Sequence, residues 1–238
     1  MFISLTTPRE RALRQKLEVE FFRTASQAAS AVRAGNDVES GMSNGHDLRI
    51  RTLLRAAYTE GMPIYAQPVL TALGKAAKPK LKPKTAFESR VVRWIEQTSM
   101  RKVTQISSTT RQQLRRVVAS ARADGLGVSA TASAIRDSFS TIGKARALSI
   151  ARTETHSAAN AAQLFAAEEL RQKEMRREWI AAEDERTRDD HADADGQTVA
   201  LDEPFSVGGE ELMYPGDAEG SPEQIINCRC ATGFLMPD

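Results

Sequence analysis

Residues 144–170, KARALSIARTETHSAANAAQLFAAEEL, decide the fold class of this chain. This Ala-rich stretch predicts one long helix, because alanine has the highest helix propensity and the larger side chains recur at helical spacing. The side chains expected to be buried are Leu148, Ala151, Thr155, Ala158, Ala162 and Phe165. On another face Arg152, His156 and Asn160 fall four residues apart and form a polar stripe.

The residue pattern of the sequence changes after Met175. Short pieces punctuated by Gly, Pro and Asp replace the long periodic stretches, which favours short strands. The strand candidates are 177–182, 197–201, 211–214 and 231–236, and residues 221–224 (SPEQ) are typical of the start of one helical turn. The expected fold class is therefore α+β, with a predominantly helical N-terminal two-thirds followed by a small α+β C-terminal module.

Further helices are expected before residue 144. Thr7 and Pro8 predict the start of a helix that ends near Gly35, and Asp47 is expected to cap a second helix that Gly61 and Pro63 end. Separate helices are expected from about 86, with Trp94 in its core face, from about 107 to 123, and from 128 to 139. The loop between the first two helices is polar, so His46 is expected to be exposed to solvent.

Five lysines fall within residues 75–84: Lys75, Lys78, Lys80, Lys82 and Lys84. Two prolines and mutual repulsion disfavour a helix here and favour an extended linker. The expected domain organisation is a helical region 1–74, the linker 75–85, a helical region 86–172 and the α+β module 173–238. Alternatively, the five lysines form a flexible arm that contacts phosphate or an acidic partner, which makes them candidate DNA- or portal-contacting residues.

The net charge of +2 conceals an uneven distribution along the 238 residues. Residues 1–160 contain 26 Lys and Arg against 12 Asp and Glu, whereas residues 161–238 contain 7 against 19. A basic half is typical of contact with nucleic acid or an acidic protein, although solvated helix faces give the same pattern. The sequence lacks an apolar run long enough for a membrane span or a signal peptide, so we expect a protein made in the cytoplasm without membrane contact.

Three potential zinc ligands occur in the C-terminal module: His191, Cys228 and Cys230. In an extended segment the two cysteines point to the same side and could bind one zinc ion with His191, although zinc sites usually contain two separated ligand pairs. The alternative, which the single pair favours, is that the cysteines are small buried side chains and that no cofactor is bound. A disulfide between residues so close would be strained, so reduced thiols are expected.

Asp184, Arg186 and Thr187 are expected to form a structural loop, because an Asp-x-Arg-Thr turn can be fixed by side-chain-to-backbone hydrogen bonds and an ion pair. Glu154 and His156 stand two residues apart on a helix and diverge too far to act as one acid–base pair. No catalytic residue is assigned, since phosphate-loop, nucleophile-elbow and metalloprotease motifs are missing from the sequence.

An ordered series of motifs resembles the phage Mu F-like minor head protein family, also called the head morphogenesis family. The series consists of residues 146–154 (RALSIARTE), Trp179, the loop 184–191 (DERTRDDH), Gly196, Phe205, 215–217 (PGD) and 226–230 (INCRC). The resemblance covers about residues 103–236. Each motif alone is weak, but the order of the whole series is specific.

This resemblance implies a structural component of the phage head that associates with the portal vertex and other head proteins during assembly and lies in the virion head, near the portal or inside with the DNA. It does not imply an enzyme. Some relatives carry a toxin domain beyond the cysteine motif, and with eight residues after Cys230 none is expected here. The alternative function is a nucleic-acid-processing enzyme or toxin-like module that uses His191 and the cysteine pair.

Overall fold

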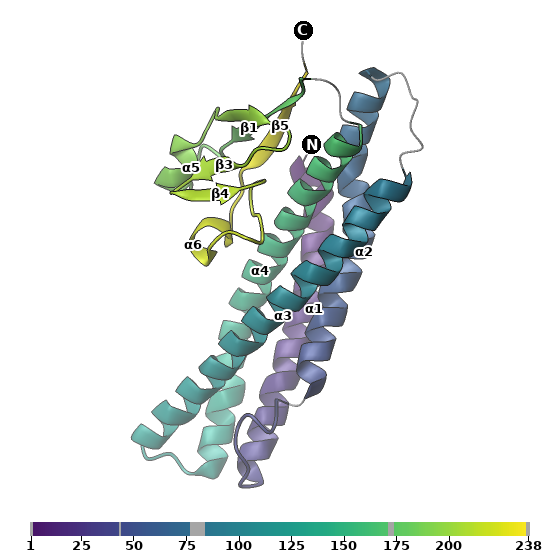
Figure 1. Cartoon of the computed structure of the whole chain (residues 1–238). Coiled ribbons are helices and arrows are strands. Elements are labelled where there is room, and N and C mark those ends of the chain that lie inside the picture. Colours follow the sequence, from purple (N-terminus) through teal and green to yellow (C-terminus); the bar gives the residue numbers. More distant parts are fainter. Residues whose placement is uncertain (1, 43, 77–83, 171–173, 237–238) are drawn as a thin grey trace. The chain divides into compact units, whose positions relative to one another are not determined.

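The computed structural model describes residues 2–42, 44–76, 84–170 and 174–236. The chain has four long helices followed by a strand-containing C-terminal module (Figure 1), which confirms the α+β class. The long helices are α1 (Phe2–Arg33), α2 (Asn44–Ala76), α3 (Lys84–Ala123) and α4 (Val128–Glu169). The module contains β1 (Arg176–Ile180), α5 (Asp189–Asp193), β2 (Thr198–Ala200), β3 (Phe205–Val207), β4 (Glu210–Leu212), α6 (Pro222–Ile225) and β5 (Ala231–Leu235). Among the described residues, no helix has both the length and the apolar character to span a bilayer.

The chain divides into two compact units, each built from separate stretches of sequence. Unit 1 contains residues 1–9, 57–95 and 152–238, and unit 2 contains residues 10–56 and 96–151. Each of the four long helices contributes a segment to both units. Unit 2 is built from helical segments, whereas unit 1 also contains the whole strand-containing module.

The helices are longer than the sequence predicted. α1 begins at Phe2 rather than near Thr7, and α2 continues through Gly61 and Pro63 to Ala76, so the prediction that these two residues end the second helix is wrong. The reason is burial: after Tyr58 the inward face continues without a break through Met62, Tyr65, Ala66, Val69 and Leu73. This packing compensates for the backbone hydrogen bonds that the prolines remove.

Two pairs of predicted helices are single helices in the structure. α3 runs without a break from 84 to 123, because the middle of its inward face is filled by polar side chains that sequence patterns do not mark as core. These side chains are Thr98, Ser99, Lys102, Ser107 and Thr110. α4 passes through Gly143 without a break, and a Cβ atom at this position would lie 3.4 Å from Cβ of Phe21, an ordinary van der Waals contact.

His46 is buried, so the expectation of a solvated histidine is wrong. It lies in the first turn of α2, with Nδ1 2.8 Å from Oγ1 of Thr24 and 3.2 Å from Oε1 of Glu20. Arg49 donates to the other oxygen of Glu20 across 2.8 Å. This polar group links α1 and α2 inside unit 2.

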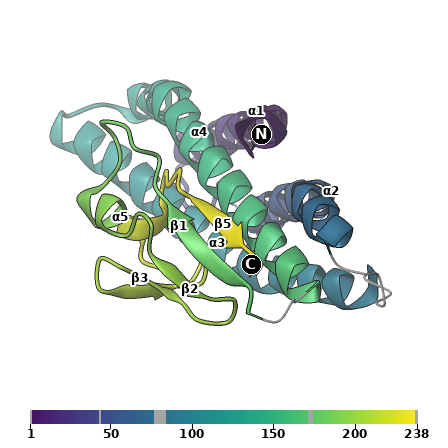
Figure 2. The same cartoon turned by 90° about the horizontal axis from the view of Figure 1, so that it is seen from above.

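The strands of the module form two small antiparallel sheets. The first has the order β2-β1-β5, with Glu178 opposite both Thr198 and Gly233, and Figure 2 shows it from above. The second is the hairpin β3-β4, whose turn consists of Gly208 and Gly209, both with positive φ. The four predicted strands are present with slightly different bounds, α6 confirms the expected helical turn, and β3 is an additional strand.

A small core holds the module together around Trp179. Its buried members are Trp179, Ala181, Ala194, Phe205, Val207, Leu212, Cys228 and Cys230. Arg177 is also buried, and its guanidinium donates to the carbonyls of Glu203 and Met213 and lies 5.0 Å above the Phe205 ring. Burial lowers the pKa of Arg177.

Candidate metal centre

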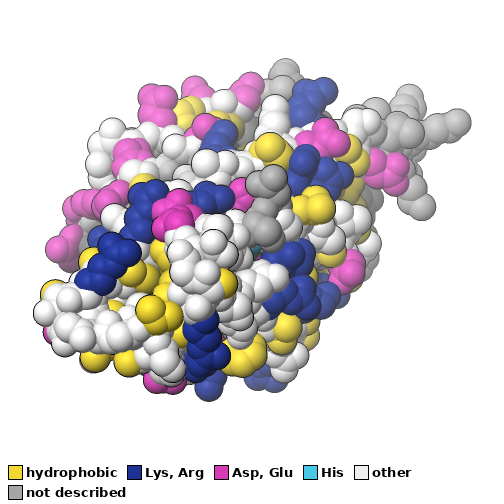
Figure 3. Space-filling model, turned by 90° about the horizontal axis from the view of Figure 1, so that it is seen from below, with side chains coloured by type: hydrophobic (Ala, Val, Ile, Leu, Met, Phe, Trp, Pro, Cys, Tyr) yellow, Lys and Arg dark blue, Asp and Glu magenta, His cyan; other side chains and the backbone are white. Residues whose placement is uncertain are grey.

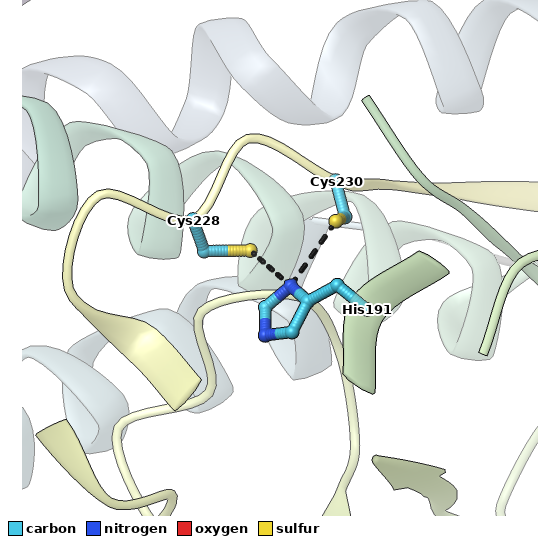
Figure 4. Close-up of side chains that lie close together, drawn as sticks. All are labelled: His191, Cys228 and Cys230. Atoms are coloured by element: carbon cyan, nitrogen blue, oxygen red, sulfur yellow. Dashed lines mark hydrogen bonds between the residues drawn. The ribbon is translucent and has the colours of Figure 1, made fainter. Parts of the chain in front are cut away.

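The structure brings His191, Cys228 and Cys230 together, although 37 residues separate the histidine from the first cysteine. α5 carries His191, and the cysteines lie between α6 and β5. Figure 4 shows both sulfurs directed at the same ring nitrogen: Nδ1 lies 3.3 Å from Sγ of Cys230 and 3.7 Å from Sγ of Cys228. All three side chains are 2% exposed.

A polar relay fixes the other edge of the His191 ring. The amide nitrogen of Gln224 lies 2.9 Å from Oδ2 of Asp190, and its amide oxygen lies 3.0 Å from Nε2 of His191. A carboxylate only accepts, so the amide nitrogen faces Asp190 and the oxygen faces the ring. Nε2 of His191 therefore carries a proton that it donates to Gln224, and Nδ1 is left to interact with the sulfurs.

The two cysteines differ in acidity. A hydrogen bond from Cys228 lowers the pKa of Cys230 to about 5, with a further contribution from His191 and against the effect of burial. The same hydrogen bond and burial raise the pKa of Cys228 well above its usual value. The site therefore favours a thiolate at Cys230, the form that binds soft metal ions.

Aromatic rings and a tight turn enclose the cluster. The rings of Trp179 and His191 lie edge to face with their centroids 5.5 Å apart, and Phe205 packs on Trp179 in the same way at 5.4 Å. A Cβ atom on Gly208 would lie 2.3 Å from the amide nitrogen of Gln224, so the glycine hairpin fits directly against the relay. Such a site can either hold a proton between a cysteine sulfur and Nδ1 of His191 or bind a metal ion at the position of that proton.

Asp184, Arg186 and Thr187 lie together in an exposed loop after β1. Asp184 Oδ1 accepts from the backbone N–H of Arg186 across 2.9 Å, and the Thr187 hydroxyl accepts from the N–H of Asp184 across 3.1 Å. The main ion-pair partner of Asp184 is Arg229, which donates to both carboxylate oxygens, whereas Arg186 is 3.9 Å away. The hydrogen bond from Arg229 is the main cause that holds the pKa of Asp184 well below its usual range.

The cysteine motif is also attached to α4. The backbone N–H of Asn227, a residue with φ of 56°, donates to Oγ1 of Thr153 across 3.0 Å. The next residue of the helix, Glu154, accepts a hydrogen bond from the buried hydroxyl of Tyr58. Segments far apart in sequence, 152–156, 184–191 and 226–230, therefore meet within unit 1.

Two residues of the polar stripe of α4, His156 and Asn160, are buried, whereas Arg152 is half-buried. His156 and Asn160 are 7% and 0% exposed, and Asn160 Nδ2 lies 3.0 Å from His156 Nε2. Burial is the main cause that lowers the pKa of His156 to about 4. A Cβ atom on Gly216 would lie 3.2 Å from the His156 ring, so the 215–217 turn packs closely on this stripe.

Sequence analysis missed three residues of this region: Gln224, Asp190 and Tyr214. Trp94 is buried as predicted, but its ring N–H also donates to the Tyr214 hydroxyl across 2.9 Å. Asp190 stands directly before His191, which is a usable signal because the partners of a metal-binding histidine are often carboxylates. Gln224 has no such signal, since only the fold brings α6 to α5.

The predicted lysines are placed only in part. Lys75 lies in the last turn of α2, and Lys84 is the first residue of α3. Lys78, Lys80 and Lys82 lie outside the described residues. The helices thus extend further into the lysine-rich segment than an extended linker over 75–85 implied.

Comparison with known proteins gives a family match over the same region. A family described as Phage Mu protein F like protein matches residues 112–233, which include the C-terminal part of α3, all of α4 and nearly all of the module. No solved structure matches the chain.

Three curated relatives are similar over part of their length. The uncharacterized protein YqbB of Bacillus subtilis (strain 168) is 24% identical over 72% of this chain and 57% of its own length. Minor head protein GP7 of Bacillus phage SPP1 is 36% identical over 39% of this chain and 30% of its own. The NAD(+)--arginine ADP-ribosyltransferase EFV of Enterococcus faecalis (strain ATCC 700802 / V583) is 33% identical over 37% of this chain and 18% of its own. In each pair the match spans less than two thirds of the relative.

Proposed function

Because this chain belongs to the family of phage Mu protein F-like proteins, we propose that it is a minor head protein of a tailed phage or prophage and acts in head morphogenesis. The similarity to the minor head protein of phage SPP1 supports this assignment. The main structural support for the proposal is that parts of the motifs at residues 146–154, 184–191 and 226–230, which resemble the family, contact one another within unit 1. Thr153 contacts the backbone of Asn227, Asp184 pairs with Arg229, and His191 faces the cysteines.

The proposed partners are the portal protein and other head proteins, with non-specific contact to packaged double-stranded DNA. Unit 2 contains 17 Lys and Arg against 9 Asp and Glu, whereas unit 1 contains 16 against 22. Figure 3 shows Lys and Arg side chains in several groups across one face. The basic unit 2 and the lysine-rich residues 75–84, which belong to unit 1, favour an acidic protein surface or phosphate, while the acidic C-terminal module of unit 1 is repelled from DNA. The proposed location is the virion head, near the portal or inside, after assembly in the host cytoplasm.

The family and the phage relative point to a structural head protein rather than an enzyme. The match to the ADP-ribosyltransferase covers 18% of that protein, which is too little to assign its activity to this chain. The nucleic-acid-processing alternative is tested by incubating plasmid DNA with the protein and Mg²⁺, Mn²⁺ or Zn²⁺, beside His191→Ala. Metal-dependent degradation that the variant abolishes would favour an enzyme.

Incorporation into particles tests the proposed role. We expect immunoblots to detect the protein in purified virions and in empty procapsids, and we expect it to co-purify with the portal protein. Deleting its gene should reduce the yield of infectious particles. Normal infectious virions that lack the protein, with no portal association during assembly, would contradict a role in head morphogenesis.

A further inference from the structure

We propose that His191, Cys228 and Cys230 bind one zinc ion, which joins α5 to the segment that leads into β5. This site is independent of the proposed role in head assembly. Two sulfurs and one imidazole nitrogen are borderline-soft ligands that zinc prefers, whereas magnesium and calcium prefer oxygen.

The distances fit a tetrahedral zinc ion. Zinc–nitrogen and zinc–sulfur bonds of about 2.0 and 2.3 Å place a nitrogen and a sulfur ligand roughly 3.6 Å apart. The two observed Nδ1–Sγ separations, 3.3 Å and 3.7 Å, lie on either side of this value, and all three atoms lie within 4.8 Å of one another. Hydrogen bonding alone explains the arrangement less well, because Nδ1 has one lone pair or one proton and faces two sulfurs.

The surroundings of His191 match those of a metal-binding histidine. Such a histidine donates its second ring N–H to an acceptor, which fixes the ring and directs the other nitrogen at the metal. Here Nε2 donates to Gln224, and Asp190 holds the amide of Gln224 in the orientation that this bond requires. Nδ1 is thereby directed at the sulfurs before any metal binds.

The module gains stability from such a link because it has little core of its own. β2, β3 and β4 contain three residues each, and the shared core has eight buried members, two of which are the cysteines. Structural zinc binding stabilises small folds directly, since the unfolded chain lacks the site. In the described part of the chain, no further His, Cys, Asp or Glu joins the three ligands, so a water molecule would take the fourth position.

The test uses the full-length protein, purified under reducing conditions without a histidine tag. We expect about one zinc per chain by elemental analysis and a loss of most of it in Cys228→Ser and in Cys230→Ser. Cobalt(II) added to the zinc-free protein should produce thiolate charge-transfer absorption and the visible bands of tetrahedral coordination. Removing zinc with a chelator should lower the melting temperature and expose the module to protease.

Gln224→Leu tests the relay as a positioning element. Metal affinity, measured by competition between the protein and a chromophoric chelator, should fall by about 10- to 100-fold in this variant. The matched control, Gln105→Leu, changes an exposed glutamine of α3 and should leave metal affinity unchanged.

Because the cysteine variants could fail to fold, the cobalt titration of the wild-type protein is the decisive measurement. A reduced, folded wild-type protein that produces no thiolate–cobalt absorption and melts at the same temperature with and without zinc would overturn the proposal. A reduced wild-type protein that contains no metal as purified and takes up none when zinc is added would overturn it as well.

Discussion

The backbone N–H of Asn227 donates to the side chain of Thr153 across 3.0 Å and so connects the cysteine motif to α4. Thr153 is 4% exposed, whereas Asn227 is exposed, so the hydrogen bond joins a buried acceptor to a surface segment. Asn227 has a left-handed backbone conformation, which sets the direction in which the chain enters the Cys228–Cys230 segment. The cysteine motif is therefore placed by α4 as well as by its own module.

Thr153→Val should lower the free energy of unfolding by about 0.5–1.5 kcal/mol, because it removes the acceptor of a part-buried hydrogen bond from the N–H of Asn227. The loss is measured by urea denaturation, and hydrogen exchange at residues 226–230 should increase. Thr153→Ser keeps the hydroxyl and is the matched control. Destabilisation by Thr153→Ser, which loses only the methyl group, with none by Thr153→Val, which loses only the hydroxyl, would show that methyl packing rather than the hydrogen bond matters.

Glu20 should make unit 2 sensitive to acid. Burial alone would raise the pKa of Glu20, but hydrogen bonds from His46 and Arg49 outweigh it and lower the pKa. A carboxyl with a lowered folded-state pKa stabilises the fold above the unfolded-state value of about 4.3, and this contribution is lost as the pH falls through the folded-state value.

Glu20→Gln should therefore cost about 1–3 kcal/mol at pH 7, and the difference from wild type should shrink below about pH 4. Urea denaturation at several pH values measures both effects. Glu96→Gln, at an exposed position of α3, should be nearly neutral throughout. A cost of Glu20→Gln that is independent of pH would contradict the electrostatic explanation.

Gly41→Ala should destabilise the loop that follows α1. A Cβ atom at this position would lie 2.6 Å from Cα of Ala28 and 2.6 Å from the carbonyl oxygen of Gln27, so the backbone itself would have to move. The expected cost is about 1–3 kcal/mol, measured by thermal or urea unfolding. Gly127→Ala has open space around its Cβ position and should be neutral or slightly stabilising. Equal effects of the two substitutions would contradict the close approach.

Neutralising Lys75, Lys78, Lys80, Lys82 and Lys84 together should weaken association with DNA or portal several-fold and make DNA binding less dependent on salt, because fewer phosphate contacts remain. Gel shifts at several salt concentrations and co-purification with portal measure this. The control replaces Lys16 and Lys144, two exposed lysines of α1 and α4, by Gln. Unchanged binding by the five-lysine variant, with weaker binding by the control, would assign the contact to the helices instead.

The sequence predicted which residues of the helices are buried better than it predicted where the helices begin and end. The buried positions Leu13, Leu17 and Phe21 of α1, and Ala151, Ala158 and Ala162 of α4, follow from apolar periodicity. The helix end expected at Gly61 and Pro63 and the break expected between residues 139 and 144 are absent, because tertiary packing outweighs local preference at these positions. The division of the chain at residues 75–85 stays a prediction, since residues 77–83 lie outside the described part.

The candidate site could be predicted in its residue types but not in its geometry. The spacing of Cys228 and Cys230 and the loop that contains His191 indicated possible ligands. The orientation of the His191 ring depends on Gln224 and on the Gly208 turn, which reach it from other segments of the module. The β3-β4 hairpin could have been predicted, because Gly-Gly between two short runs with apolar ends is typical of a two-residue turn.

The discontinuous units have a consequence for synthesis on the ribosome. Unit 2 is complete once residue 151 has emerged, whereas unit 1 requires residues 152–238 as well as the first nine residues of the chain. Residues 1–9 can therefore join unit 1 only after residues 152–238 have been synthesised. A product of premature termination near residue 151 would contain every residue of the helical unit but none of the cluster, so the assembled cluster marks a polypeptide that has been translated at least as far as Cys230.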